Sequence, residues 1–281
     1  MDHSRFFANK WKQLLEEGDR PRALTGISQM EYSKFSELVL GADQKAAAEV
    51  AERIFAGEAI ILKNALLKEK VDQIKKVAFD FAALNSASHN EIIPDCPDWH
   101  EINDTMETAN GGYTVLDHSY YFFRWNEGNG ELFNTADTYW ELCKIFNGYA
   151  PGAFKTNLPA DGLVDRIQLI NYPRGGGHIS THTDPDFCIR ALFGFHLSSS
   201  ETDYDAGGFY IINGAGERVM LEDNMSCGDI VCWYSFIPHG VEFIDPDRPT
   251  NFQSHDGRWF MACNTIQSHL VKDRYRALPV G

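Results

Sequence analysis

The sequence predicts an α+β protein in which helices and long loops of the first half cover an antiparallel β core in the second half. Three observations carry this prediction. Apolar positions before about residue 160 recur at helical spacing, residues from about 164 onward form short apolar runs, and glycine-rich turns separate those runs. The β core is therefore expected to be a sandwich or a small barrel.

The first half contains two clear helix patterns around one strand. Asp43 can cap a helix that stops at Gly57, and the apolar stretch 59–62 then predicts a strand. In the next helix the apolar positions between Val71 and Phe81 recur three and four residues apart, which gives one buried stripe.

A third helix is expected from Thr135 to Phe146, because its apolar positions again lie three and four residues apart. Residues 92–130 before it are rich in proline, aspartate, asparagine, glycine and aromatic residues, which predicts long loops. Long loops in a compact domain are often functional, so we expect these loops to cover a substrate.

The second half carries the β pattern. Its apolar runs are, in order, RIQLINY, IRALFGFHL, GGFYII, DIVCWYSF, GVEFI and RWFMACNTI. Turn-forming residues separate them, which favours antiparallel pairing. A length of 281 residues suits a single domain over residues 1–281. Residues 1–160 are expected to supply helices and covering loops, 161–270 the core and 271–281 a tail.

Composition excludes several classes of function. The net charge of −15 and the lack of a lysine or arginine cluster speak against a nucleic-acid partner, although an acidic surface could attract a cationic substrate. The sequence contains no uninterrupted apolar segment of about 18 residues, so no membrane span is predicted. The N-terminus lacks the apolar region of a secretory signal, so a cytoplasmic location is expected. The six cysteines suggest neither a disulfide framework nor a zinc site.

The most informative segment is His182-Thr183-Asp184, followed much later by His239. Side chains two residues apart in an extended strand point to the same side, so those of His182 and Asp184 can converge on one ion. His239 lies between two apolar runs, at or near a strand junction, and can supply a third ligand. Two imidazoles and one carboxylate with open positions are typical of non-haem iron(II) oxygenases.

The surrounding motifs resemble the 2-oxoglutarate and iron(II)-dependent oxygenase superfamily, in particular prolyl-hydroxylase-like and small-molecule hydroxylase members. The matching segments are Asn171-Tyr-Pro173 with the glycines before His182, Ala206-Gly-Gly208 with FYII, and Cys227-Gly-Asp229 with IV before the distal histidine. The resemblance covers about residues 164–270 and implies a double-stranded β-helix (jelly-roll, cupin-like) core with the N-terminal helices packed on it. It implies iron(II), 2-oxoglutarate and O2 as cofactor and co-substrates.

The resemblance also implies an arginine for the distal carboxylate of 2-oxoglutarate, on the strand after the distal histidine. Arginine suits this task because its planar guanidinium makes two parallel bonds to a carboxylate. Arg248 stands between prolines and suggests a solvent-exposed turn, whereas Arg258 opens an apolar run. We therefore expect Arg258 to bind the co-substrate.

Other polar residues of the core are weaker candidates for the co-substrate site. His196 falls where related enzymes often place a group that contacts the 5-carboxylate, but a buried histidine bonded to backbone explains it equally well. Gln168 and Tyr172 share one face of a strand and could touch co-substrate or substrate, with ordinary barrel lining as the alternative for Gln168.

The resemblance implies a hydroxylase that decarboxylates 2-oxoglutarate to succinate and CO2. Asp184 fills the position that a chloride ion would need, so hydroxylation is preferred over halogenation. A small molecule is the favoured substrate, with a cationic amino-acid-derived or alkaloid natural product as a candidate. Two alternatives remain open: hydroxylation of a protein side chain, and a cupin-type barrel that binds a ligand without turnover.

Overall fold

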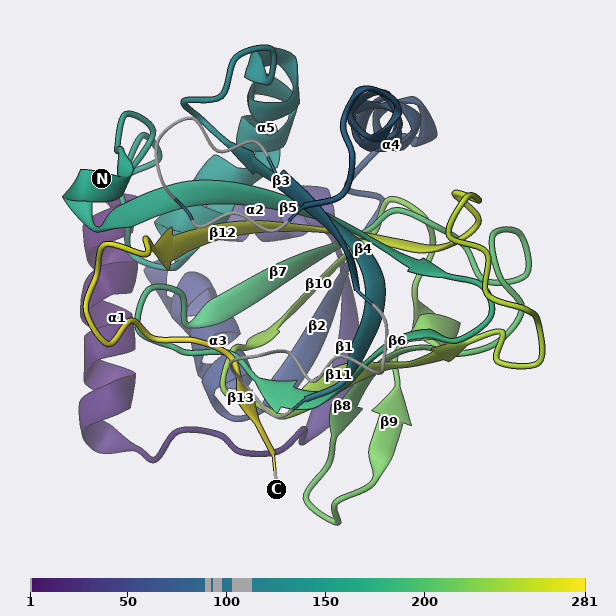
Figure 1. Cartoon of the computed structure of the whole chain (residues 1–281). Coiled ribbons are helices and arrows are strands. Elements are labelled where there is room, and N and C mark those ends of the chain that lie inside the picture. The colour runs from purple at the N-terminus through teal and green to yellow at the C-terminus, as the bar shows by residue number, and fades with distance from the viewer. Residues whose placement is uncertain (1, 89–91, 93–97, 103–112, 281) are drawn as a thin grey trace.

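The computed structural model describes residues 2–88, 92, 98–102 and 113–280 (Figure 1). Its α-helices are α1 (His3–Glu17), α2 (Tyr32–Leu40), α3 (Gln44–Phe55), α4 (Lys68–Leu84) and α5 (Gly130–Phe146). The strands before the core are β1 (Gly26–Glu31), β2 (Glu58–Lys63), β3 (Asp98–Ile102) and β4 (Val115–Phe123). Core strands follow as β5 (Leu163–Pro173), β6 (Gly177–Thr183), β7 (Ala191–His196), β8 (Gly208–Ile212), β9 (Arg218–Met220), β10 (Ile230–Tyr234), β11 (His239–Ile244) and β12 (Gly257–Gln267), with β13 (Leu278–Pro279) after them.

Two sheets face each other across the core. The first sheet has the order β1-β2-β10-β7-β12-β5-β4, with β3 on β4, and the second has the order β6-β11-β8-β9, with β13 on β6. The chain passes from one sheet to the other at almost every core strand. This winding confirms the double-stranded β-helix that the sequence resemblance implied, and β4 joins the two sheets by pairing with both β5 and β6.

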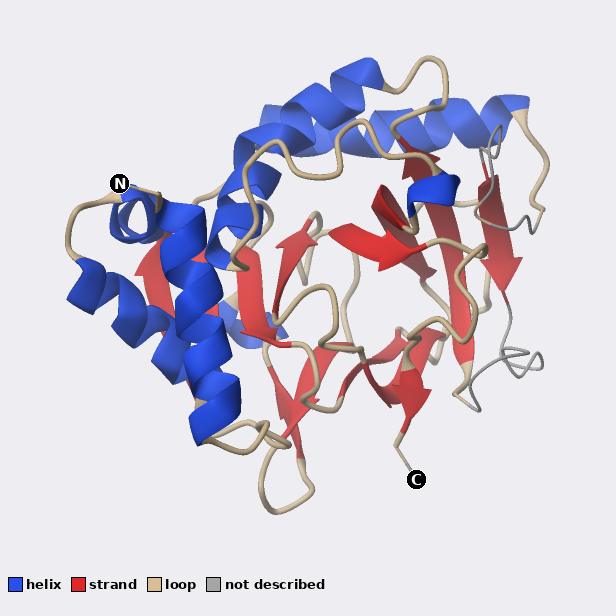
Figure 2. Cartoon of the chain, turned by 90° about the vertical axis from the view of Figure 1, so that its left-hand side faces the viewer, coloured by secondary structure: helices blue, strands red, loops and turns tan. Residues whose placement is uncertain are grey.

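Figure 2 shows the longer helices at the left of the β core and across its top. They reach the outer face of the first sheet through aromatic contacts: the rings of Phe146 in α5 and Phe193 in β7 lie 5.9 Å apart, and those of Phe81 in α4 and Phe122 in β4 lie 5.5 Å apart. The second sheet lacks such a cover among the described helices. None of those helices is long and apolar enough to span a bilayer.

The local patterns that predicted the helices are present in the structure. The Asp43 side chain accepts a hydrogen bond from the backbone N–H of Ala46 at 3.1 Å, so it caps α3 as expected. Helix α5 begins at Gly130, five residues before the predicted start. The described cysteines are free thiols, and Cys96 lies outside the described residues.

The prediction of long loops over residues 92–130 is wrong for the parts that form β3 and β4. The residues of β4 alternate between two faces, and the register pairs Tyr121 with Gln168 of β5. The aromatic residues of this stretch are therefore strand residues that pack on both faces, which composition alone did not reveal. Residues 93–97 and 103–112 lie outside the described residues, so the expected covering role stays a prediction.

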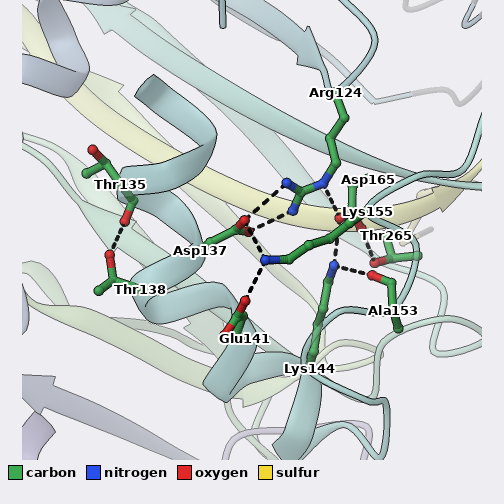
Figure 3. A network of polar contacts seen from close by, with 10 residues as sticks. All are labelled: Arg124, Thr135, Asp137, Thr138, Glu141, Lys144, Ala153, Lys155, Asp165 and Thr265. Carbon is green, nitrogen blue, oxygen red and sulfur yellow. Dashed lines mark hydrogen bonds and ion pairs between the residues drawn. The ribbon is translucent and has the colours of Figure 1, made fainter. Parts of the chain in front are cut away.

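A buried network of charges fixes the start of β5 against α5 (Figure 3). The Asp165 carboxylate accepts from Arg124 Nε and from Lys144 Nζ, each at 2.6 Å, and from Thr265 Oγ1 at 3.1 Å. Arg124 also donates to Asp137 at 2.7 Å. Because side chains alternate along a strand, Asp165 points toward the helices, whereas the next residue, Arg166, points into the cavity between the sheets.

Candidate metal centre and cavity

Two neighbouring strands of the second sheet bring three candidate ligands together. His182 lies near the end of β6, and His239, the first residue of β11, is its direct partner in the antiparallel register. Asp184 follows β6, two residues after His182, and its backbone N–H donates to the carbonyl of Ser235. One ligand atom from each of the three side chains lies within 4.8 Å of the others. The sequence predicted these three residues as one cluster, and the structure places them as one.

Hydrogen bonds fix the orientation of both imidazole rings. His182 Nδ1 lies 3.0 Å from the Ser180 carbonyl oxygen, and His239 Nδ1 lies 2.8 Å from that of Ile237. A carbonyl oxygen can only accept, so each Nδ1 donates a proton, which leaves Nε2 as the ring nitrogen that can bind a metal. This arrangement is the one that metal-ligating histidines adopt.

The electrostatics of the cluster also suit a cation. Burial and the neighbouring His239 lower the pKa of His182 to about 4, so its ring is neutral at pH 7. Burial would raise the pKa of Asp184, but the neighbouring His239 and His182 and the positive charge of Arg166 hold it below its usual value. Two imidazoles and one carboxylate form the donor set, which fits an iron(II) ion with open positions.

The cluster borders a cavity of about 410 Å³ between the two sheets. Alternate residues of β5 and β12 form much of its wall, and the register sets Tyr172 opposite Arg258 and Gln168 opposite Ala262. The wall therefore belongs mainly to the first sheet, whereas the ligand cluster belongs to the second.

Arg258 lies at one end of this wall and is buried, with 1% of its surface exposed. Its Nε–H donates to the carboxylate of Glu222, and its guanidinium carbon lies 5.9 Å from the centre of the Tyr172 ring. Its buried Nη2 has no hydrogen-bond partner in the described part of the chain. An unpartnered donor that lines a cavity is where a carboxylate ligand can bind. The rival candidate, Arg248, lies on an exposed turn and pairs with Asp205.

Of the other residues predicted for the co-substrate site, two line the cavity and one does not. Tyr172 and Gln168 both line the cavity. The amide nitrogen of Gln168 lies 3.2 Å from the Tyr121 hydroxyl, so Gln168 belongs to a polar network of the wall. His196 does not line the cavity; its Nε2 lies 3.2 Å from Glu222 Oε2. Any influence of His196 on a co-substrate would therefore pass through Glu222 and Arg258.

Sequence reasoning missed Glu222, which is buried although it lies in a polar 3-10 turn, Glu222–Asn224. The carboxylate also accepts the backbone N–H of Phe209 at 2.7 Å. Its place depends on Gly208, since a Cβ at that position would lie 1.9 Å from Glu222 Cγ. The glycine pair that the sequence singled out thus makes room for the partner of Arg258.

Arg166 was missed as well, although strand alternation could have found it, because it shares one face of β5 with Gln168 and Tyr172. Asp117 of β4 is a third omission. It is buried at the cavity wall, and burial raises its pKa to about 7.

Comparisons with known proteins gave structural neighbours only. No family model and no curated protein matches the chain. A prolyl-4-hydroxylase from Pseudomonas putida is 14% identical, with 82% of this chain and 98% of that chain covered and a TM-score of 0.49. A full-length Neurospora crassa protein in complex with alpha-KG is 14% identical, with coverages of 88% and 89% and a TM-score of 0.49. An oxidoreductase of the 2OG-Fe(II) oxygenase family from Burkholderia pseudomallei is 10% identical, with coverages of 84% and 91% and a TM-score of 0.45. At such values the function has to be inferred from the chain's own residues.

Proposed function

We propose that the protein is an iron(II)- and 2-oxoglutarate-dependent dioxygenase that hydroxylates an unactivated C–H bond of a small molecule. In the overall reaction one oxygen atom of O2 enters the C–H bond, and the other enters succinate as 2-oxoglutarate loses CO2. The observation that carries the proposal is the pairing of the His182, Asp184 and His239 cluster with a buried, incompletely bonded Arg258 in one cavity.

Each part of the site has a distinct task in this proposal. His182, Asp184 and His239 would hold the iron, which supplies open coordination positions for 2-oxoglutarate and O2. Arg258 would bind the distal carboxylate of 2-oxoglutarate through its free Nη2 edge, beside Tyr172. The apolar wall excludes water from the reacting C–H bond.

The size and lining of the cavity support a small molecule as the substrate. Its volume of about 410 Å³ lies within the range of small-molecule sites, and its lining combines apolar residues such as Ile170 and Leu192 with a few polar groups. An amino-acid-derived natural product or a molecule of similar size would fit beside the co-substrate.

The test is the addition of iron(II) and 2-oxoglutarate without oxygen. The protein should develop a visible charge-transfer band, and His239→Ala should abolish it. His255→Ala, which changes an exposed loop histidine outside the cluster, is the matched control and should retain the band. The absence of a band in the unmodified protein would refute the proposal and favour a barrel without turnover.

A further inference from the structure

We infer that the substrate of this cavity carries a carboxylate and that Arg166 binds it. The inference rests on the proposed function, because it assigns the charged group of the molecule that would be hydroxylated. It concerns the end of the cavity wall opposite Arg258 and residues that the co-substrate does not need.

The register of the first sheet places the two arginines apart. Arg166 pairs with Asn264 of β12, whereas Arg258 pairs with Tyr172, six residues farther along β5. A strand rises about 3.3 Å per residue, so these two rows of the wall are roughly 20 Å apart along β5. The three candidate metal ligands line the same cavity as both rows.

Arg166 has no carboxylate partner in the described ranges. Its Nη2 donates to the neutral amide oxygen of Gln168 at 2.9 Å, its guanidinium carbon lies 4.8 Å from the centre of the Tyr121 ring, and its buried Nε has no hydrogen-bond partner. Two other arginines with little exposed surface differ: Arg124 pairs with Asp165, and Arg258 pairs with Glu222.

An arginine keeps its proton even at a partly buried site, so Arg166 is a cation. The described carboxylate whose charge acts on it is Asp184, which would be engaged as a metal ligand. A bound anion would therefore balance a charge that no ion pair balances within the described ranges. The site therefore favours a ligand that brings its own negative charge.

The surrounding side chains narrow the class of ligand. The planar guanidinium fits a carboxylate through two parallel hydrogen bonds, and the amide of Asn264, which also lines the cavity, can add a single hydrogen bond beside it. Ile170 and Leu192 line the adjoining wall and suit an apolar body. The expectation of a cationic substrate, which came from the net charge, is disfavoured because Arg166 would repel a cation.

The test measures binding by calorimetry without oxygen, using protein loaded with iron(II) and 2-oxoglutarate and, in parallel, protein free of both. The probes are hexanoate and 3-phenylpropanoate, each compared with its amide. The acids should bind at least about 10-fold more tightly than the amides, and Arg166→Gln should weaken acid binding by about 10- to 100-fold. Arg166→Lys keeps the positive charge but lacks the planar guanidinium. Its affinity for the acids should lie between those of the unmodified protein and of Arg166→Gln.

Arg218→Gln is the matched control, because Arg218 is an exposed arginine of β9 that pairs with Glu242 outside the cavity, and acid binding should be unchanged. Equal binding of acids and amides, equal binding by Arg166→Gln, or no acid binding at all would overturn the inference. Loss of 2-oxoglutarate binding in Arg166→Gln would also overturn it, by assigning Arg166 to the co-substrate. A protein that binds acids through Arg166 but shows no charge-transfer band would support the inference and refute the proposed function.

Discussion

Arg258 donates its Nε–H to the carboxylate of Glu222 inside the barrel, while its Nη2 remains unpartnered among the described residues. Nε of the Arg258 guanidinium is therefore bound within the protein, whereas Nη2 is left for a ligand. Glu222 holds one edge and fixes the plane of the group, and Arg258 lines the cavity in which a carboxylate would bind. Glu222 is in this sense a positioning residue for Arg258.

Replacing Arg258 should weaken 2-oxoglutarate binding. Arg258→Gln removes charge-assisted hydrogen bonds worth about 1.5–3 kcal/mol each, so the dissociation constant of 2-oxoglutarate should rise by about 10- to 100-fold or more. Titration of the anaerobic charge-transfer band measures this constant. Arg248→Gln changes the exposed arginine of the turn and should leave the constant unchanged; equal effects of the two substitutions would contradict the assignment.

Replacing Glu222 should destabilise the fold and change its response to acid. Glu222→Gln leaves Arg258 buried without its counter-charge, so the free energy of unfolding should fall by about 3–5 kcal/mol at pH 7. Burial raises the pKa of Glu222, but Arg258 and His196 bring it below its usual value near 4.5. The stabilisation is therefore present above about pH 4.5 and is lost as the pH falls further.

Urea unfolding at pH 7 and pH 4 tests this expectation. The difference in stability between Glu222→Gln and the unmodified protein should shrink at the lower pH. Glu242→Gln, which removes a partly exposed partner of Arg218, should cost less than about 1 kcal/mol. A Glu222→Gln protein as stable as the unmodified one at pH 7 would show that the carboxylate does not support Arg258.

Replacing Asp117 should stabilise the protein at alkaline pH. Burial raises the pKa of this carboxyl from 3.8 to about 7, so the folded state favours the protonated form. Ionisation then costs stability as the pH rises from about 4 to 7, and the full cost is present above pH 7. Asp117→Asn removes this cost and should increase the free energy of unfolding by about 2 kcal/mol more at pH 8 than at pH 5.

The measurement is denaturant unfolding of Asp117→Asn at both values of pH. Asp247→Asn, at an exposed position, serves as the control and should show no such difference. An identical stability change at pH 5 and pH 8 would mean that the folded protein ionises Asp117 as readily as the unfolded chain does.

Replacing Asp165 should destabilise the junction between α5 and the first sheet. Asp165→Asn leaves Arg124 and Lys144 without their shared buried carboxylate, and a loss of about 3–5 kcal/mol in the free energy of unfolding is expected. Asp137→Asn is the comparison, because Asp137 is only partly buried, and its loss should be smaller. A smaller effect of Asp165→Asn than of Asp137→Asn in urea unfolding would contradict the central place of Asp165 in the network.

The sequence predicted the features that depend on residues close together in the chain. Short apolar runs between turns predicted the β core, the period of two predicted the common side of His182 and Asp184, and the apolar run after Arg258 predicted that it lies in the core. The capping of α3 by Asp43 followed from local turn chemistry in the same way.

The features that the sequence did not reveal depend on contacts between distant segments. Glu222 lies in a polar turn that is typical of a surface, and its burial depends on Gly208 and Arg258. Strand β1 has a partly polar sequence and exists as the edge strand beside β2. Strand β4 was obscured by the polar composition around it, since its identity depends on pairing with β5 and β6.

The division of labour between the two sheets has a practical consequence for protein engineering. The proposed iron ligands lie on or directly after β6 and β11, which pair with each other. The side chains that would select the substrate lie on β5 and β12. Libraries that vary Arg166, Gln168, Ala262 and Asn264 should therefore change substrate preference and leave the proposed metal ligands in place. The proposed reactive centre and the side chains that would select its substrate can thus be varied separately.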